Sequence, residues 1–367
     1  MKVRKVFISH SWTDVGVNIQ TKAVAKKLSE NYEVIFLSQA RIGAPVIQEN
    51  KNLRVIEWPH KRPNTLKDFF FACKQIIKEK PDAFIVHFGA TNVSMLASWL
   101  LRVNYRICWM HTLSGQFYSD KDDEKVARRN VDKRRWVYSL ATNVIVLNEY
   151  GRRDAKEGYK IPEKKIFKIY NGIYPIPMAT HRQEGVKSIR FIGRLDKSKG
   201  LDVVLEAFAR LSTGREDVRL DIAGAGPELE LLTTWIIEHK LEDKITYHGY
   251  FTDYEQSRKF ISEAYCLIVP SRIDNFPTVI LEALSAAVPV IGSDVAGIPD
   301  MIENNKDGYL VEVGNIPAFA NAILSLVDNE GLRNELGKQA KENFETKFSM
   351  DQHVKNVEGF MMGLFKD

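Results

Sequence analysis

The sequence predicts an α/β protein built from two doubly wound halves, each with a mostly parallel sheet. Short β-branched and aromatic runs alternate with helical stretches along the chain, a pattern typical of parallel strands joined by crossover helices. The alternation is interrupted at 172–185, which is rich in Pro and Gly, and then restarts. The length of 367 residues also exceeds the usual size of one domain. We therefore expect two domains and a linker.

The first half is expected to contain six strands, each a short run of mostly apolar residues. These strands are 5–9, 33–37, 53–56, 83–87, 106–111 and 143–147. Helical spacing of the apolar residues predicts helices at 19–29, 65–78 and 93–101.

The second half repeats the alternation. Its predicted strands are 188–192, 219–223, 244–248, 264–269 and 288–292. Its predicted helices are 200–211, 228–238, 253–263, 278–286 and 316–328.

The composition is that of an ordinary globular chain, with 44% hydrophobic and 27% charged residues. It excludes a disordered, collagen-like or disulfide-scaffold protein. Three widely separated cysteines, Cys73, Cys108 and Cys266, form neither a disulfide framework nor a CxxC pair, and we expect buried thiols in a reducing cytosol. The apolar window 83–103 contains His87, Thr91 and Asn92, so it reads as a strand and a packed helix rather than a membrane span.

Charge is distributed unevenly along the chain. Residues 1–170 carry 31 Lys and Arg against 17 Asp and Glu, whereas the remainder carries 21 against 30. The excess of +14 in the first half indicates an anionic partner such as a lipid surface or a lipid-linked phosphate. Basic solvated helix faces explain it equally well. No nucleic-acid-binding motif accompanies the charge, so no nucleic-acid partner is expected.

Ligands of open α/β sheets bind at the carboxyl ends of the strands. In the first half, Gly16 follows the first strand and could let backbone N–H groups approach an anion, although a plain loop is as good a reading. His111 ends the fifth strand, where it could bind a hydroxyl or carbonyl of a substrate. The alternative is a structural histidine.

The strongest phosphate signal follows the strand 188–192. Arg194 and Lys199 lie on one loop between Gly193 and Gly200, just before a predicted helix. Two cations near a helix N-terminus suit a diphosphate. A solvated basic loop would not need glycines on both sides.

A glycine turn at 224–228 is half of a nucleotide fingerprint, and Tyr250 could receive a base. In the segment 269–284, Asp274 precedes a predicted helix and Glu282 falls on its second turn, about 8 Å further along the axis. An acid at each place could hold sugar hydroxyls. The alternative is a helix-dipole charge plus an exposed or oddly buried glutamate.

In order, GRLDKSKG (193–200), GAGPE (224–228), the segment 269–291, SDVAGIPDMI (293–302) and NKDGYLV (305–311) resemble the nucleotide-sugar domain of the retaining glycosyltransferases of family four, or group 1 glycosyltransferases. The segment 147–173 is also similar to that family. The resemblance implies the GT-B fold, in which two Rossmann-like domains, 1–172 and 173–349, face each other across a central cleft. It implies further that a C-terminal helix, 350–367, crosses back to the acceptor-binding first domain.

The resemblance also implies residue roles. Arg194 and Lys199 would hold the donor diphosphate, Glu282 the ribose, and Asp274 with its following N–H groups the donor sugar. His111 would lie near the developing charge. The rest of the implied donor site is Gly16, Tyr250, Asn275, Phe276, Thr278 and Val279.

The expected activity is transfer of a hexose or N-acetylhexosamine, with retention, from a nucleoside diphosphate sugar, UDP above all. The acceptor would be a glycan or lipid-linked saccharide in bacterial cell-surface polysaccharide synthesis. We expect no metal and no cofactor beyond the sugar nucleotide, and a cytoplasmic location, peripheral on the inner face of the membrane. A GT-B epimerase or a non-catalytic nucleotide- or glycan-binding protein remain alternatives. An oxidoreductase is disfavoured because no complete GxGxxG is present.

Overall fold

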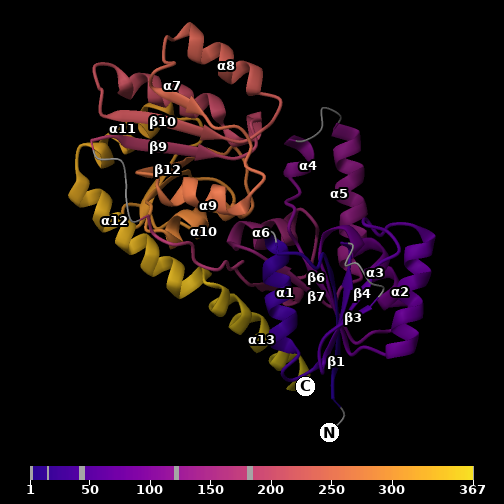
Figure 1. The fold of residues 1–367 in the computed structure, drawn as a ribbon. Helices are drawn as coiled ribbons and strands as arrows, with labels where there is room; N and C mark the ends of the chain where they lie inside the picture. The colour runs from indigo at the N-terminus through magenta and orange to yellow at the C-terminus, as the bar shows by residue number, and fades with distance from the viewer. Residues whose placement is uncertain (1–2, 15, 41–45, 120–123, 180–184, 367) are drawn as a thin grey trace. The chain divides into compact units, whose positions relative to one another are not determined.

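The computed structural model describes residues 3–14, 16–40, 46–119, 124–179 and 185–366 (Figure 1). The chain forms two compact units. The first comprises Met1–Gly172 together with Met350–Asp367, and the second comprises Ile173–Ser349. Each unit has its own sheet, parallel except at one edge of the first, and its own hydrophobic core.

The sheet of the first unit has eight strands in the order β3-β4-β2-β1-β5-β6-β7-β8. The strands are β1 (Lys5–His10), β2 (Glu33–Ser38), β3 (Val46–Asn50), β4 (Leu53–Glu57), β5 (Ala83–Val86), β6 (Tyr105–Trp109), β7 (Asn143–Val146) and β8 (Ile166–Lys168). All pairings are parallel except β3 with β4. The order of strands reverses between β1 and β5, which makes their carboxyl ends the topological switch point where such sheets bind ligands.

Helices cover this sheet. They are α1 (Val17–Leu28), α2 (Leu66–Glu79), α3 (Thr91–Leu100), α4 (Gln116–Ser119), α5 (Glu124–Ser139), α6 (Glu149–Glu157) and α13 (Met350–Lys366), with single turns at Phe88–Ala90 and Glu163–Lys165. The helix α13 comes from the far end of the chain and lies beside α1 (Figure 1).

The second unit has a six-stranded parallel sheet in the order β11-β10-β9-β12-β13-β14. Its strands are β9 (Lys187–Ile192), β10 (Val218–Ala223), β11 (Ile245–Tyr247), β12 (Cys266–Val269), β13 (Val290–Ser293) and β14 (Gly308–Val311). Its helices are α7 (Leu201–Ser212), α8 (Leu229–Glu238), α9 (Tyr254–Ser262), α10 (Thr278–Ser285), α11 (Ile316–Val327) and α12 (Glu330–Asn343), with short turns at Lys197–Lys199, Ile298–Asp300 and Phe344–Phe348. Here the switch point lies between β9 and β12.

The predicted strands and helices are all confirmed, with ends that differ by one or two residues. The sequence analysis set no bounds for β3, β8, β14, α4, α5, α6 or α12. The reason is physical for β3, an antiparallel edge strand whose residues are all at least partly exposed, and for β8, which has only three residues. Neither strand carries the continuous apolar run that marks a buried parallel strand.

The cysteine expectation needs one correction. All three cysteines are free thiols, but only Cys108 and Cys266 are buried, whereas Cys73 is partly exposed on α2. Of the helices in the described residues, none is long and apolar enough to span a membrane.

The helix α11 packs on α7 in the core of the second unit, and a substitution on α11 tests how much this packing stabilises the unit. The side chain of Phe319 on α11 is fully buried in this core. We expect Phe319→Ala to destabilise the second unit by about 3–5 kcal/mol, because the cavity left behind adds to the lost apolar burial. The measurement is the urea midpoint of unfolding. Leu231→Ala on the outer side of α8, where the side chain is 46% exposed, is the matched control and should leave the midpoint almost unchanged. Equal shifts of the urea midpoint in the two variants would contradict the placement of Phe319 in the core.

Candidate functional site

A cavity of about 240 Å³ lies at the switch point of the second unit. It is enclosed by the carboxyl ends of β9 and β12, the loops that follow them, and the first turn of α10. Its lining comprises Phe191, Ile192, Gly193, Arg194, Lys199, Ile268, Val269, Ser271, Asp274, Pro277, Thr278 and Val279. Five predicted site residues are therefore brought together: Arg194, Lys199, Asp274, Thr278 and Val279.

The two cations of this cavity each contact an acid. The Lys199 ammonium forms an ion pair with the Asp274 carboxylate, and these side chains are 27% and 11% exposed. The Arg194 guanidinium pairs with Asp196 but is 62% exposed. Asp196 is held in place because its carboxylate accepts hydrogen bonds from the backbone N–H and hydroxyl of Ser198. Both cations can thus turn toward an anionic ligand. Arg194 is exposed and can do so at little cost, and Lys199 can exchange the Asp274 carboxylate for an oxygen anion of the ligand.

Glycines after β10 position the loop that carries these cations. A Cβ atom on Gly224 would lie 1.8 Å from the Gly193 carbonyl oxygen, and one on Gly226 would lie 2.2 Å from the Leu195 carbonyl oxygen. The Leu195 N–H donates to the Ala225 carbonyl at 2.9 Å across this contact. The GAGPE motif, which the sequence presented as half of a nucleotide fingerprint, therefore supports the neighbouring loop.

Arg272 is a site residue that the sequence analysis missed as such. Its guanidinium binds the Asp202 carboxylate through two hydrogen bonds of 2.9 and 2.6 Å and donates to the Lys197 carbonyl. Its backbone N–H donates to the Ser198 carbonyl. These bonds tie the loop of Asp274 to the loop of Lys199. The only signal in the sequence was an arginine two residues before Asp274.

The helix α10 begins at Thr278, with Pro277 as its N-cap residue. The loop before it is buried at Asp274, Asn275 and Phe276, which are all less than a tenth exposed. Asn275 and Phe276 do not line the cavity. They lie between Asp274 and the N-cap of α10, and the Phe276 ring packs against Phe348.

Glu282 lies on the second turn of α10, as predicted, and is buried. The Tyr254 hydroxyl on α9 donates to its Oε1 atom at 3.0 Å, and the Arg258 guanidinium stacks over the Tyr254 ring at 5.4 Å. Burial raises the pKa of Glu282 to about 7, against the lowering effect of Tyr254 and Arg258. Glu282 therefore holds a proton for part of the time near neutral pH, and Tyr254 is a partner that the sequence did not reveal.

Tyr250 follows β11 and is 69% exposed, outside the cavity lining. Gly16 lies in the first unit as the N-cap of α1, with a positive φ of 53°. His111 also lies in the first unit. The predicted site residues therefore form two sets, one in each unit.

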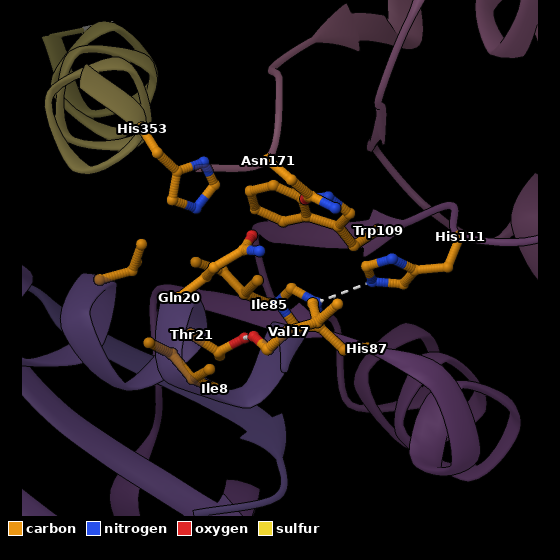
Figure 2. A pocket seen from close by; sticks show the side chains of 11 residues that line it. Ile8, Val17, Gln20, Thr21, Ile85, His87, Trp109, His111, Asn171 and His353 are labelled. Carbon is orange, nitrogen blue, oxygen red and sulfur yellow. Dashed lines mark hydrogen bonds between the residues drawn. The ribbon is translucent and has the colours of Figure 1, made fainter. Parts of the chain in front are cut away.

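In the first unit His111 belongs to a cluster of histidines at the switch point (Figure 2). Its Nε2 atom lies 3.1 Å from Nδ1 of His87, and its ring stacks on Phe88 at 3.9 Å. The His87 ring stacks in turn on His10 at 4.9 Å. His353 of α13 contacts Trp109, which stacks on His87 from β6. Sequence analysis found only His111, because the others come from separate segments that the fold brings together.

Burial keeps these imidazoles neutral. It lowers the pKa of His10 and of His353 to about 4. Burial, and then the neighbouring histidines, hold the pKa values of His87 and His111 well below the ordinary 6.5. The Nδ1 atom of His353 donates to the Tyr170 carbonyl at 2.7 Å, which fixes its tautomer. A neutral imidazole can donate or accept a hydrogen bond without adding charge.

Two further N–H groups line the cavity of this cluster. Gln20 Nε2 and Trp109 Nε1 are buried and have no hydrogen-bond partner in the described part of the chain. Figure 2 shows both side chains among the labelled residues around the cavity, with His111 and His353. Such donors suit an oxygen atom of water or of a ligand.

Two protein-family models match the chain. Residues 15–175 match the model described as Glycosyltransferase Family 4, and residues 177–343 match the model described as Glycosyl transferases group 1. The two matches divide the chain close to the boundary between its two units.

Known proteins similar to the chain include two curated relatives. One is the N-acetyl-alpha-D-glucosaminyl L-malate synthase of Bacillus anthracis, 28% identical over 50% of this chain and 47% of that protein. Another is the poly(ribitol-phosphate) alpha-N-acetylglucosaminyltransferase of Staphylococcus aureus, 26% identical over 78% of this chain and 57% of that protein. The chain thus spans about half the length of these relatives.

Among solved structures, the chain is similar to Anabaena HepE in complex with UDP. The TM-score is 0.76 at 15% identity, and the match covers 98% of this chain and 100% of that one. At this identity the likeness shows a common fold, the GT-B fold.

The neutral histidines predict a loss of stability in acid. The unfolded chain protonates histidine near pH 6.5, whereas folded His10 resists protonation down to a pKa of about 4. Stability of the first unit is therefore fully present above 6.5 and falls as the pH drops toward 4, by up to about 3 kcal/mol for each such histidine. His10→Gln should make the urea midpoint less dependent on pH between 7 and 5. His239→Gln changes an exposed histidine and should leave the pH dependence of the urea midpoint intact. A pH dependence that His239→Gln reduces and His10→Gln leaves intact would contradict the view that buried His10 stays neutral.

The hydrogen bond from Tyr254 to Glu282 predicts that a substitution of Tyr254 changes the pKa of Glu282. Removing the hydroxyl donor in Tyr254→Phe should raise the pKa of Glu282 above the value of about 7, because the carboxylate then loses a hydrogen bond that favours its charged form. Carboxyl ¹³C NMR of labelled glutamate would measure the shift. A Glu282 resonance that titrates with an ordinary pKa in the unchanged protein would refute the buried environment.

Proposed function

The chain belongs to the group 1 and family 4 glycosyltransferases, and from that premise we propose that it transfers a hexose or N-acetylhexosamine from a UDP-sugar to an acceptor hydroxyl with retention of configuration. The observation that carries the proposal is the meeting of Arg194, Lys199 and Asp274 in one cavity. Two cations and an acid at the carboxyl ends of parallel strands suit a diphosphate that bears a sugar.

The cations would act mainly on the leaving group. As the bond from the anomeric carbon to the diphosphate oxygen breaks, negative charge develops on that oxygen. Arg194 and Lys199 stabilise this charge, as does the N-terminus of α7 that follows them. Lys199 pairs with Asp274, and this ion pair orients its ammonium at the cavity. We propose that these cations take the place of a divalent metal and that no further cofactor takes part.

Retention is proposed to follow a front-face route. The acceptor oxygen forms its bond to the anomeric carbon on the side from which the diphosphate departs, and the acceptor proton passes to the departing phosphate oxygen. Asp274 in its ion pair with Lys199 is better suited to bind a sugar hydroxyl than to attack carbon. No carboxylate pair with the spacing of a nucleophile and an acid was found in the sequence. Neutral His111 would hydrogen-bond the donor sugar.

The remaining donor contacts are also proposals. Glu282 would bind the ribose, with Tyr254 releasing its carboxylate, and the N–H groups of Asn275 and Phe276 would contact the sugar. Thr278 and Val279 lie at the start of α10, where N–H groups suit phosphate oxygens. Gly16 and Tyr250 would complete the donor site from the loops that follow β1 and β11.

UDP is proposed as the nucleotide because the similar HepE structure contains UDP. N-acetylglucosamine is the sugar group in the names of both curated relatives. The acceptor is proposed to be a glycan or lipid-linked saccharide of a bacterial surface polysaccharide, reached from the cytoplasmic face of the membrane. The +14 balance of residues 1–170 supports an anionic partner of this kind.

Titration with UDP, GDP, ADP and dTDP by calorimetry tests the proposal. We expect one nucleotide, UDP, to bind, and Lys199→Ala and Glu282→Ala to weaken it. Lys199→Ala should also lower the rate of UDP release from the donor at least tenfold, about 1.4 kcal/mol of transition-state stabilisation.

Lys197→Ala is the matched control, because Lys197 is exposed on the same loop but does not line the cavity. It should leave binding and rate almost unchanged. Binding of no nucleotide, or equal effects of the two lysine variants, would overturn the donor site. Conversion of the donor to an isomeric sugar nucleotide without an acceptor would indicate an epimerase instead.

A further inference from the structure

The outer side of α2 is apolar, although its inner side already packs on the core. Ala72 and Ile76 are buried beneath the helix, whereas Leu66, Phe70 and Ile77 are 76%, 65% and 60% exposed. At 100° per residue these three side chains fall within about 40° of one another on the helix surface. A surface helix of a globular protein normally turns polar residues outward, so this line of large apolar side chains needs a partner.

A line of lysines runs beside the apolar one. Lys67, Lys74 and Lys78 are all exposed and lie about 80–120° from Leu66 around the helix. Neither acid of α2 is itself exposed. Asp68 is fully buried in the capping box at the N-terminus. The Glu79 side chain, 8% exposed, is held by Lys5 and Arg54 and also pairs with Lys78 at 3.4 Å, which leaves the Lys78 side chain 64% exposed. The exposed surface of α2 is therefore apolar and cationic.

The neighbouring helix continues this character. The helix α3 packs beside α2 (Figure 1) and ends in Trp99 and Leu100, which are 49% and 56% exposed. Arg102 follows them and is also exposed. We call Leu66, Lys67, Phe70, Lys74, Ile77, Lys78, Trp99, Leu100 and Arg102 the α2–α3 face.

We propose that the α2–α3 face binds the surface of an anionic lipid bilayer. Apolar and aromatic side chains on one line can enter the boundary between headgroups and acyl chains, while the lysines beside them reach the anionic headgroups with their long stems lying along the apolar surface. Each cation near such a surface adds attraction. A nucleic acid would attract the lysines but would offer no apolar surface to Leu66, Phe70 and Ile77. A groove on another protein could cover these apolar side chains, but it would also have to supply acidic groups for the lysines.

The inference rests on the proposed function for its purpose, which is to hold the enzyme where a lipid-linked acceptor lies. It does not depend on the transfer reaction for its evidence. The face lies on the helices of the first unit, whereas the proposed nucleotide contacts Arg194, Lys199 and Glu282 lie in the second. Membrane binding and nucleotide binding can therefore be measured separately.

The test is flotation of the full chain with vesicles of phosphatidylcholine, alone or mixed in equal parts with phosphatidylglycerol. We expect the chain to float with the mixed vesicles and to be released by high salt. The double variant Phe70→Ser/Ile77→Ser should reduce the bound fraction at least tenfold. The triple variant Lys67→Gln/Lys74→Gln/Lys78→Gln should reduce it by roughly a hundredfold and remove most of the salt dependence.

The control is Leu231→Ser/Ile237→Ser on α8 of the second unit, where the side chains are 46% and 63% exposed. It should float like the unchanged chain. All variants change exposed side chains. The urea midpoint of unfolding checks the fold of each variant, and UDP titration checks the donor site separately. Absence of flotation, equal loss in the α8 control, or flotation that ignores phosphatidylglycerol would overturn the proposal. A dimer in ultracentrifugation that Phe70→Ser/Ile77→Ser converts to a monomer, without lipid binding, would assign the face to a second copy instead.

Discussion

The bare backbone at Gly224 and Gly226 is the constraint on which the cavity of the second unit depends. No side chain fits between the turn after β10 and the carbonyl groups of Gly193 and Leu195. That contact fixes the path of the loop after β9, and the Arg272–Asp202 ion pair ties the loop after β12 to it. Only then can Lys199 meet Asp274 across the cavity. The charged groups are therefore placed by packing of backbone, and their own attraction is a consequence of that placement.

Burial sets the protonation of the other site groups, with opposite signs in the two units. In the first unit it keeps His10 and His353 neutral by lowering their pKa values, so acid opposes folding. In the second it raises the pKa of Glu282 to about 7, so this group's contribution to stability is full below pH 4.5 and is lost as the pH rises through 7. Both sites avoid an unpaired buried charge. The exposed or ion-paired groups Arg194, Lys199 and Asp274 instead carry the charge that lines the cavity of the second unit.

The helix α2 shows how one segment can serve the core and a surface at once. Its capping box at Thr65 and Asp68 holds the first turn, and the buried Ala72 and Ile76 attach it to the sheet. These contacts fix the helix without help from Leu66, Phe70 or Ile77. The outer side chains remain largely exposed, which leaves them available for the proposed contact with a bilayer.

The sequence by itself determined the central strands of both sheets, most of their helices and the loops that follow β9 and β12, because buried parallel strands and strand-to-helix turns have local patterns. It identified Arg194, Lys199, Asp274 and Glu282 for the same reason, since each lies in a short motif. Only the tertiary structure decided their partners. Tyr254 beside Glu282, Arg272 between two loops, and His10, His87 and His353 around His111 come from segments far apart in the chain. No local pattern records such pairs, because packing of the sheets brings them together.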